Sequence, residues 1–391
     1  GNLSYTRCIK EDPVKEGLLY LGTENALYVS NDDGENWQSL MSNLPHSPMY
    51  WMEVQEHFND LVVGTYGRGI WILDDISPLQ QLDESIEKKE SHLFDIKPSY
   101  RFQNVTSSLQ MFPEASTGQD PPNGASINYW LKEKQDDIEI IITNQKNDTI
   151  KTIKEKGSKG INRIWWNFSG EKTDDIVFRT KPLYADWVSL DKNRERKVPY
   201  NFSILSPPGT YNITLKSGEN TMTKSLEVIK DPHSEGTIED IMLQNQLVTK
   251  IYDDINLAIH YINSIEVVRR QLLDLKAMLK NTNHKEELIS LVDDLESEFL
   301  ELEKQLTQLK TTGTGQDEVR YEKMIGEKLS YLADNVQIYD FRPADSYYEV
   351  HKLLKSRLDK VGEQFEKLKN ENLKNTLSSL RDKGVDIIVM E

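Results

Sequence analysis

The polar residues best suited to chemistry in the first third of the chain lie in the stretch TYGRGIWILDD, which ends at Asp75. Tyr66, Arg68 and Asp74 supply a phenol, a guanidinium and a carboxylate within nine residues. A guanidinium binds carboxylates through paired hydrogen bonds, and a deprotonated phenol can act as a nucleophile. These three residues are therefore a candidate ligand wall. The alternative, which we favour, is that Arg68 pairs with Asp74 or Asp75 while Trp71 fills a core.

Adjacent aspartates are a second candidate for acid–base chemistry. Glycoside hydrolysis needs two carboxyl groups roughly 5–10 Å apart on either side of one bond. Neighbouring residues of a strand point to opposite faces, so an Asp-Asp pair is poorly placed for both roles. We expect solvated turns or strand ends at all of these pairs: 32–33, 74–75, 136–137, 174–175, 253–254 and 293–294.

Two adjacent tryptophans could bind a sugar by stacking. Trp165 and Trp166 lie in RIWWNF, a strand-like run in which successive side chains alternate between faces. One ring should therefore enter a core, and the other could face solvent. Packing inside the protein is the favoured use of both rings.

The remaining reactive side chains are scattered. The 7 histidines follow no metal-ligand spacing, and the 1 cysteine, Cys8, allows neither an internal disulfide nor a thiolate cluster. The chain carries no P-loop and no dinucleotide fingerprint. We expect no metal, no cofactor and no complete set of catalytic residues.

Composition narrows the class of protein. The chain has 391 residues, a hydrophobic content of 37% and a formal net charge of −17. Its length suggests two or three domains with real cores. Its negative charge would repel nucleic acid, and no apolar run is long enough to span a membrane. We therefore expect neither a nucleic-acid partner nor a membrane span.

The order of elements predicts a multidomain protein that is β-rich first and helical last. Residues 1–80 contain short aromatic strands, and the charged residues 81–91 form an expected linker. Residues 92–232 return to strands bounded by turn residues, which favours an Ig-like β-sandwich with a long polar excursion at 171–199. Residues 233–391 have helical periodicity and predict an antiparallel four-helix bundle.

Heptad spacing carries the helical prediction. Thr237 followed by Asp240 has the form of a capping box at the start of the first helix. Apolar residues then recur at coiled-coil intervals, with the clearest seams at Ile241, Val248, Ile255 and Ile262, at Ile251, Ala258, Ile265, Leu272 and Leu279, and at Leu288, Val292, Leu295, Phe299, Leu302, Leu306 and Leu309.

A short spaced motif identifies the local structure of the first segment. SNDDGENW places Ser30, Asp32, Gly34 and Trp37 at the spacing of an Asp-box, the BNR repeat. In such a turn Asp32 can accept backbone N–H groups, Gly34 can adopt a positive φ, and Trp37 can fold back between strands. The motif locks a hairpin and carries no chemistry itself.

The sequence around this motif resembles a known family. LLYLGTENALYVSNDDGENWQSLMSNLP and NDLVVGTYGRGIWILDDISPLQQL resemble the last blade region of large bacterial β-propeller proteins with sortilin-like BNR repeats. These proteins are often labelled glycosyl hydrolases or sialidase-like. GINRIWWNF, PPGTYNITLKSGENTMTKSLEVIKDP and EKLSYLADNVQIYDFRPADSYYEVHKLL resemble the C-terminal half of the same family.

The resemblance implies a particular organisation. A blade needs about four strands and a closed ring about four to eight blades, so residues 1–80 supply one blade and a little more. The remaining blades would come from the same or another chain. The resemblance also implies export by a bacterium, to the periplasm, the cell surface or the medium.

Three functional hypotheses follow. The leading one is a non-catalytic C-terminal portion that serves structure and interaction, with a glycan or a protein as partner. The second is part of a glycoside hydrolase acting on polysaccharide, to which Tyr66 and Arg68 contribute one wall. The third is a carbohydrate-binding sandwich centred on Trp165 or Trp166.

Overall fold

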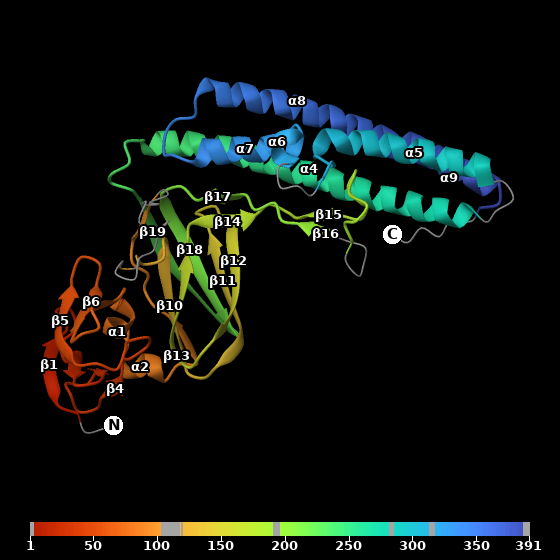
Figure 1. Cartoon of the computed structure of the whole chain (residues 1–391). Coiled ribbons are helices and arrows are strands. Elements are labelled where there is room, and N and C mark those ends of the chain that lie inside the picture. Colours follow the sequence, from red (N-terminus) through yellow and green to blue (C-terminus); the bar gives the residue numbers. More distant parts are fainter. Residues whose placement is uncertain are drawn as a thin grey trace. The chain divides into compact units, whose positions relative to one another are not determined.

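The computed structural model describes residues 4–102, 118, 120–190, 196–280, 285–312 and 317–385. The chain is β-rich first and helical last, as the sequence predicted (Figure 1). It forms two compact units. The first comprises Gly1–Ser169 with Pro208–Asp231, and the second comprises Gly170–Pro207 with Pro232–Glu391.

Two small antiparallel sheets form the start of the first unit. One has the order β1 (Thr6–Glu11), β2 (Leu19–Thr23), β3 (Leu27–Ser30) and β4 (Gln38–Ser39). The other has the order β5 (Met49–Gln55), β6 (Asp60–Thr65) and β7 (Ile70–Leu73). Strand alternation buries one face of each sheet in a shared core, whose members include Leu18, Tyr20, Val29, Met49, Met52, Val54, Leu61 and Val63.

The expected linker is partly helical. Helix α1 (Ser77–Gln81) is followed by α2 (Glu84–Glu87), whose first turn is capped by the Asp83 carboxylate accepting from the backbone N–H of Ile86 at 2.9 Å. Leu82 and Ile86 are buried in a small cluster with Phe94. The charged sequence around Leu82 and Ile86 gave no sign of these two apolar contacts, and the linker at 81–91 stays a prediction.

Two larger sheets complete the first unit. A three-stranded sheet has the order β13 (Gly160–Trp166), β10 (Ala125–Leu131) and β8 (Ser91–Leu93). A five-stranded sheet has the order β12 (Thr149–Gly157), β11 (Gln135–Thr143), β18 (Gly209–Ser217), β19 (Asn220–Lys230) and β9 (Ser99–Arg101), with β19 and β9 parallel. The alternation expected in β18 is present, because Tyr211, Ile213 and Leu215 are buried.

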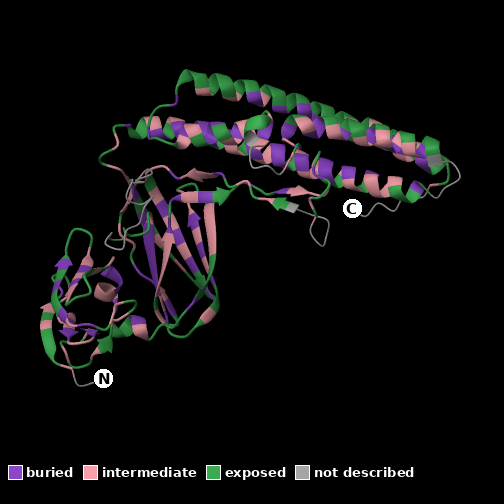
Figure 2. Ribbon diagram, in the orientation of Figure 1, coloured by how far each residue is buried: buried purple, intermediate pink, exposed green. Residues whose placement is uncertain are grey.

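The helices form the core of the second unit. Their bounds are α4 (Ile238–Leu279), α5 (Lys285–Leu306), α6 (Asp317–Arg320), α7 (Ile325–Gln337) and α8 (Asp345–Lys367), then a π-helical turn η1 (Leu368–Asn372) and α9 (Leu373–Asp382). Every residue of the predicted apolar seams on α4 and α5 is buried. Figure 2 shows buried positions recurring between exposed and intermediate ones along the helices. The predicted capping box also forms, since Thr237 and Asp240 exchange hydrogen bonds at 3.1 Å.

The segment Gly170–Pro207, which includes the predicted polar excursion, belongs to the helical unit. It contributes the pairs β14 (Ser169–Lys172) with β17 (Ser203–Leu205) and β15 (Ile176–Phe178) with β16 (Arg196–Val198). Ile176 and Phe202 are buried in the helical core. Residues 170–207 therefore pack with α4 rather than with the sheets that flank them in sequence, which corrects the single range 92–232.

Candidate functional site

The Asp-box residues form a closed hydrogen-bonded turn between β3 and β4. The Ser30 hydroxyl donates to Asp32 at 2.7 Å and accepts from the N–H of Gly34 at 2.9 Å. Asp32 also accepts from the N–H and the side-chain amide of Asn36, at 2.8 and 2.7 Å. The Asn36 N–H, the Asn36 amide and the Ser30 hydroxyl hold the pKa of Asp32 below its ordinary value. The half-buried Trp37 donates its indole N–H to the Gly34 carbonyl at 2.9 Å.

Gly34 is the position at which this turn depends most on residue type. Its φ is 88°, which L-residues adopt at a cost of about 1–2 kcal/mol. Gly34→Ala should therefore lower the free energy of unfolding of the first unit by about that amount, measured by urea denaturation. Gly64→Ala is the control, because a Cβ there would lie at ordinary distance, 3.8 Å, from the Cβ of Trp51. Equal effects of the two changes would contradict the role of the turn.

The proposed ligand wall does not assemble. Tyr66 and Arg68 lie at the turn between β6 and β7, whereas Asp74 follows the far end of β7. The five residues between Arg68 and Asp74 include the four of β7, which span about 13 Å. Burial and the nearby Asp60 carboxylate raise the pKa of Asp74. Arg68 is exposed, and its carbonyl accepts the indole N–H of Trp71 at 2.9 Å. Tyr66 and Arg68 therefore lie before β7 and Asp74 lies after it.

Tyr66 instead belongs to an aromatic stack. Its ring lies 5.6 Å from that of Tyr50, and the Arg7 guanidinium lies 5.2 Å from the Tyr50 centroid. Arg7 is also paired with Glu24. Tyr66 is 69% exposed, so this stack reaches the surface.

The outer face of the β5–β6–β7 sheet carries several apolar side chains that are open to solvent. Trp51 pairs across Gly64 with Ile70, and Glu53 pairs across Val62 with Ile72 in the next row. Trp51, Ile70 and Ile72 are exposed by 68%, 74% and 57%. We call Trp51, Val62, Ile70 and Ile72 the outer face of this sheet.

The β1–β4 sheet has a similar row on the side away from the shared core. Ile9 pairs with Leu21, which pairs with Tyr28. Ile9 is 61% exposed, and Leu21 and Tyr28 are half-buried. The two sheets thus share one buried core and present apolar side chains on both outward sides. Contiguous exposed apolar surface of this kind marks an interaction surface.

A buried polar cluster joins the end of β7 to the three-stranded sheet. The Asp75 carboxylate accepts from Ser126, from Asn128 at 3.0 Å and from the Ser77 hydroxyl at 2.6 Å. Arg163 donates to the carbonyls of Asp74 and Asp75, at 2.5 Å each. Burial lowers the pKa of Arg163. The hydrogen bonds are made within the protein, so the cluster acts as a structural joint. The partners lie far apart in sequence, and no motif could have identified them.

The two tryptophans have different environments. Trp166 is fully buried, 5.4 Å from Phe168 and 5.1 Å from Tyr211 between ring centroids, so it cannot stack on a sugar. Trp165 is half-buried beneath the Arg163 guanidinium, which lies 5.9 Å from its centroid. It lines a depression of about 400 Å³ that also contains Glu155. Trp165 alone remains a candidate for binding sugars.

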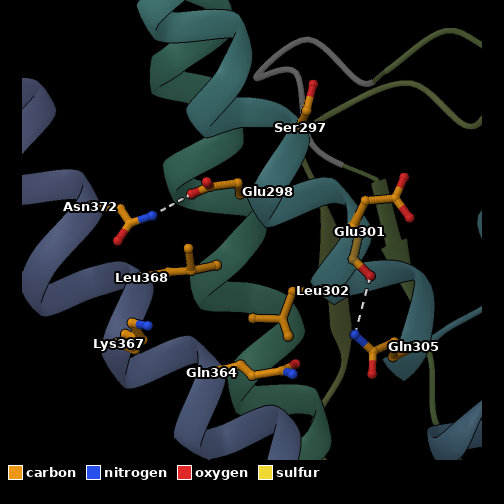
Figure 3. Close-up of a pocket in the computed structure, with 9 residues that line it drawn as sticks. All are labelled: Ser297, Glu298, Glu301, Leu302, Gln305, Gln364, Lys367, Leu368 and Asn372. Atoms are coloured by element: carbon orange, nitrogen blue, oxygen red, sulfur yellow. Dashed lines mark hydrogen bonds between the residues drawn. The ribbon is translucent and has the colours of Figure 1, made fainter.

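A groove of about 450 Å³ lies between α5 and the junction of α8 with η1 (Figure 3). Leu302 and Leu368 supply its apolar surface, and Asn372 donates to Glu298 at 2.7 Å on one side. A π-helical turn of this kind often accompanies a functional site. The groove's lining contains no histidine or cysteine, and its charged residues are Glu298, Glu301 and Lys367.

Two other kinds of site, a metal site and a membrane-spanning helix, have no candidate among the described residues. Within the ranges that the structure describes, no group of three or more His, Cys, Asp or Glu residues is arranged to hold a metal ion. None of the helices described combines the length and apolar composition needed to cross a bilayer. In comparisons with known proteins, the chain matched no family model, no curated protein and no solved structure.

Proposed function

We propose that this chain is the non-catalytic C-terminal portion of an exported bacterial β-propeller protein of the BNR-repeat type. In this proposal the β1–β4 and β5–β7 sheets are neighbouring propeller blades, the second of them incomplete. The two larger sheets form an Ig-like sandwich that acts as spacer and interaction module. The helices form an antiparallel four-helix bundle that gives rigid support.

The observation that carries the proposal is the pair of apolar outer faces. In a propeller every blade packs on a neighbour at each side, so a blade needs two apolar faces. Trp51 and Ile70 on one sheet and Ile9 on the other have this character while lying exposed. The Asp-box turn at Ser30 to Trp37 supports the same interpretation. The partner is therefore a blade of like construction, from the same or another chain.

The proposal can be tested by making the same substitution, Ile70→Lys, in the present chain and in the full gene product. Ile70→Lys in the present chain should change the free energy of unfolding by less than about 0.5 kcal/mol, because Ile70 is 74% exposed. In the full gene product, where we propose that another blade covers it, the same change should cost about 2–4 kcal/mol. Tyr331→Lys, at a helical residue that is 63% exposed, is the control. A small effect of Ile70→Lys in both contexts would reject the proposal.

A second candidate function is glycan binding at Trp165. The depression that it lines supports this, since an aromatic ring beside the Glu155 carboxylate suits a sugar. Glycan-array binding should be lost in Trp165→Ala and retained in Trp187→Ala, whose ring is 66% exposed in the other unit. Binding that survives Trp165→Ala would exclude this site. The hydrolase alternative would rest on Tyr66 and Arg68 alone, without Asp74.

A further inference from the structure

Helix α4 holds the edge of the excursion with polar side chains. Asn256 accepts from the N–H of Asp174 at 3.0 Å, and Asn263 accepts from the N–H of Val177 at 2.8 Å. Further along, Glu266 accepts from the N–H groups of Arg179 and Thr180. Strand β15 lies alongside α4 (Figure 1). These three helix residues accept the backbone N–H groups in and beside β15 that a neighbouring strand would otherwise accept.

Glu266 is part of a buried ionic cluster. Arg269 donates to Glu296 at 2.8 Å, to Glu266 at 3.2 Å and to Glu303 at 2.6 Å. The side chains of Glu266 and Glu303 are 0% exposed, Arg269 is 6% exposed and Glu296 is 14% exposed. The Thr180 hydroxyl donates to Glu266 at 2.7 Å and accepts from Arg269 at 3.2 Å. One guanidinium therefore contacts three carboxyl groups and Thr180, which follows β15.

The hydrogen bonds of the cluster require an additional proton. Glu266 accepts at both of its oxygens, whereas Oε1 of Glu303 is buried without a donor. Burial, then the Glu266 carboxylate, raises the pKa of Glu303 well above its ordinary value, against the opposite effect of Arg269. A proton on Glu303 would satisfy its orphan oxygen and would bond it to Glu266. It would also remove one of the two fully buried negative charges.

We propose that Glu303 keeps its proton at neutral pH and donates it to Glu266, so that a single proton fastens β15 to α4 and α5. The charged groups that act on Glu303 are Glu266 and Arg269 of α4, and Glu296 of α5 reaches the cluster through Arg269. The segment that follows β15 contributes the uncharged Thr180, whose hydroxyl accepts from Arg269. Loss of the proton would place two buried carboxylates beside one guanidinium. It would also weaken the hydrogen bonds between Glu266 and Thr180.

The sign of the pH dependence follows from the raised pKa. The folded unit binds a proton at Glu303 that the unfolded chain releases above about pH 4.3, the ordinary value for Glu. The stabilisation from this proton is complete below that pH and declines as pH rises toward the folded pKa. Over this window the unfolding constant should rise about tenfold per pH unit because of Glu303.

The test compares the full chain with Glu303→Gln, in which the amide imitates a protonated carboxyl. Urea denaturation followed by far-UV circular dichroism, from about pH 5 to about pH 8, isolates the Glu303 contribution as the difference between the two proteins. We expect the unfolding constant of the wild type to rise about tenfold more per pH unit than that of Glu303→Gln. Glu301→Gln, at an exposed residue on α5, should follow the wild type. Parallel curves for wild type and Glu303→Gln would overturn the proposal.

A second measurement does not depend on the stability of a variant. The 13C chemical shift of the Glu303 carboxyl in the unmodified chain should be that of a protonated acid at neutral pH, and hydrogen exchange at the Thr180 amide should lose protection as that signal titrates. A Glu303 signal of an ionised carboxylate at neutral pH would refute the proposal.

Discussion

Replacing Arg269 with methionine should destabilise the helical unit by about 3–5 kcal/mol. The Arg269 guanidinium contacts Glu266, Glu296 and Glu303 together. Methionine fills similar space but removes the hydrogen bonds that Arg269 donates to Glu296, Glu266 and Glu303, together with the positive charge that compensates the cluster. Removing one partner of a buried ionic network costs much more than the network contributes as a whole.

The measurement is the free energy of unfolding from urea titration at neutral pH, followed by helical circular dichroism. Arg270→Met is a matched control on the next residue, because Arg270 pairs with Asp274 at the surface and is 24% exposed. Such a pair contributes about 0–1 kcal/mol. If the Arg269 variant lost no more stability than the Arg270 variant, the buried cluster would not hold the unit together.

Trp166→Ala should cost the first unit about 3–5 kcal/mol, as expected for removing a large aromatic side chain from a core. The Trp166 ring is fully buried between Phe168 and Tyr211, and its indole N–H donates to the Ser169 carbonyl at 3.0 Å. Its removal leaves a cavity and frees a carbonyl. Near-UV circular dichroism during thermal unfolding gives the measurement.

The adjacent Trp165 supplies the comparison for this prediction. Trp165 lies on the opposite side of β13 and is half-buried. Its change to alanine should cost about 1 kcal/mol. Equal losses for the two variants would mean that the alternation along β13 does not decide which ring forms the core.

Periodic features were predictable from the sequence because neighbours along one element determine them. The heptad seam of α4 from Ile241 to Leu279 is buried throughout, and Thr237 caps this helix with Asp240. The alternation in β18 likewise follows from local pattern. In each case the signal lies within one helix or strand, where residue spacing fixes the face.

The polar contacts that hold distant segments together were not predictable. Arg163 reaches Asp74 across 89 residues, and Glu266 reaches Thr180 across 86. Charged residues on an amphipathic helix normally face solvent, so nothing in the spacing of Glu266, Arg269 and Glu303 marks them as buried. For the same reason the excursion after β14 gave no sign that it would pack on α4.

The separation of the three ligand-wall residues has a geometric reason. Tyr66, Arg68 and Asp74 are close in sequence, but β7 extends between Arg68 and Asp74 and separates them. Residues on either side of a four-residue strand lie far apart in space, because a strand is extended. Residues separated by one helical turn lie close together.

The central claim is that the two small sheets are propeller blades with uncovered sides, and the accessibility of Trp51 tests it most directly. Hydroxyl-radical footprinting should modify Trp51 rapidly in the present chain, where it is 68% exposed. In the full gene product the account predicts strong protection of Trp51, with Ile70 protected alongside it, because another blade lies on that face. Equal modification of Trp51 in both proteins would show that the face is simply open surface and would contradict the account.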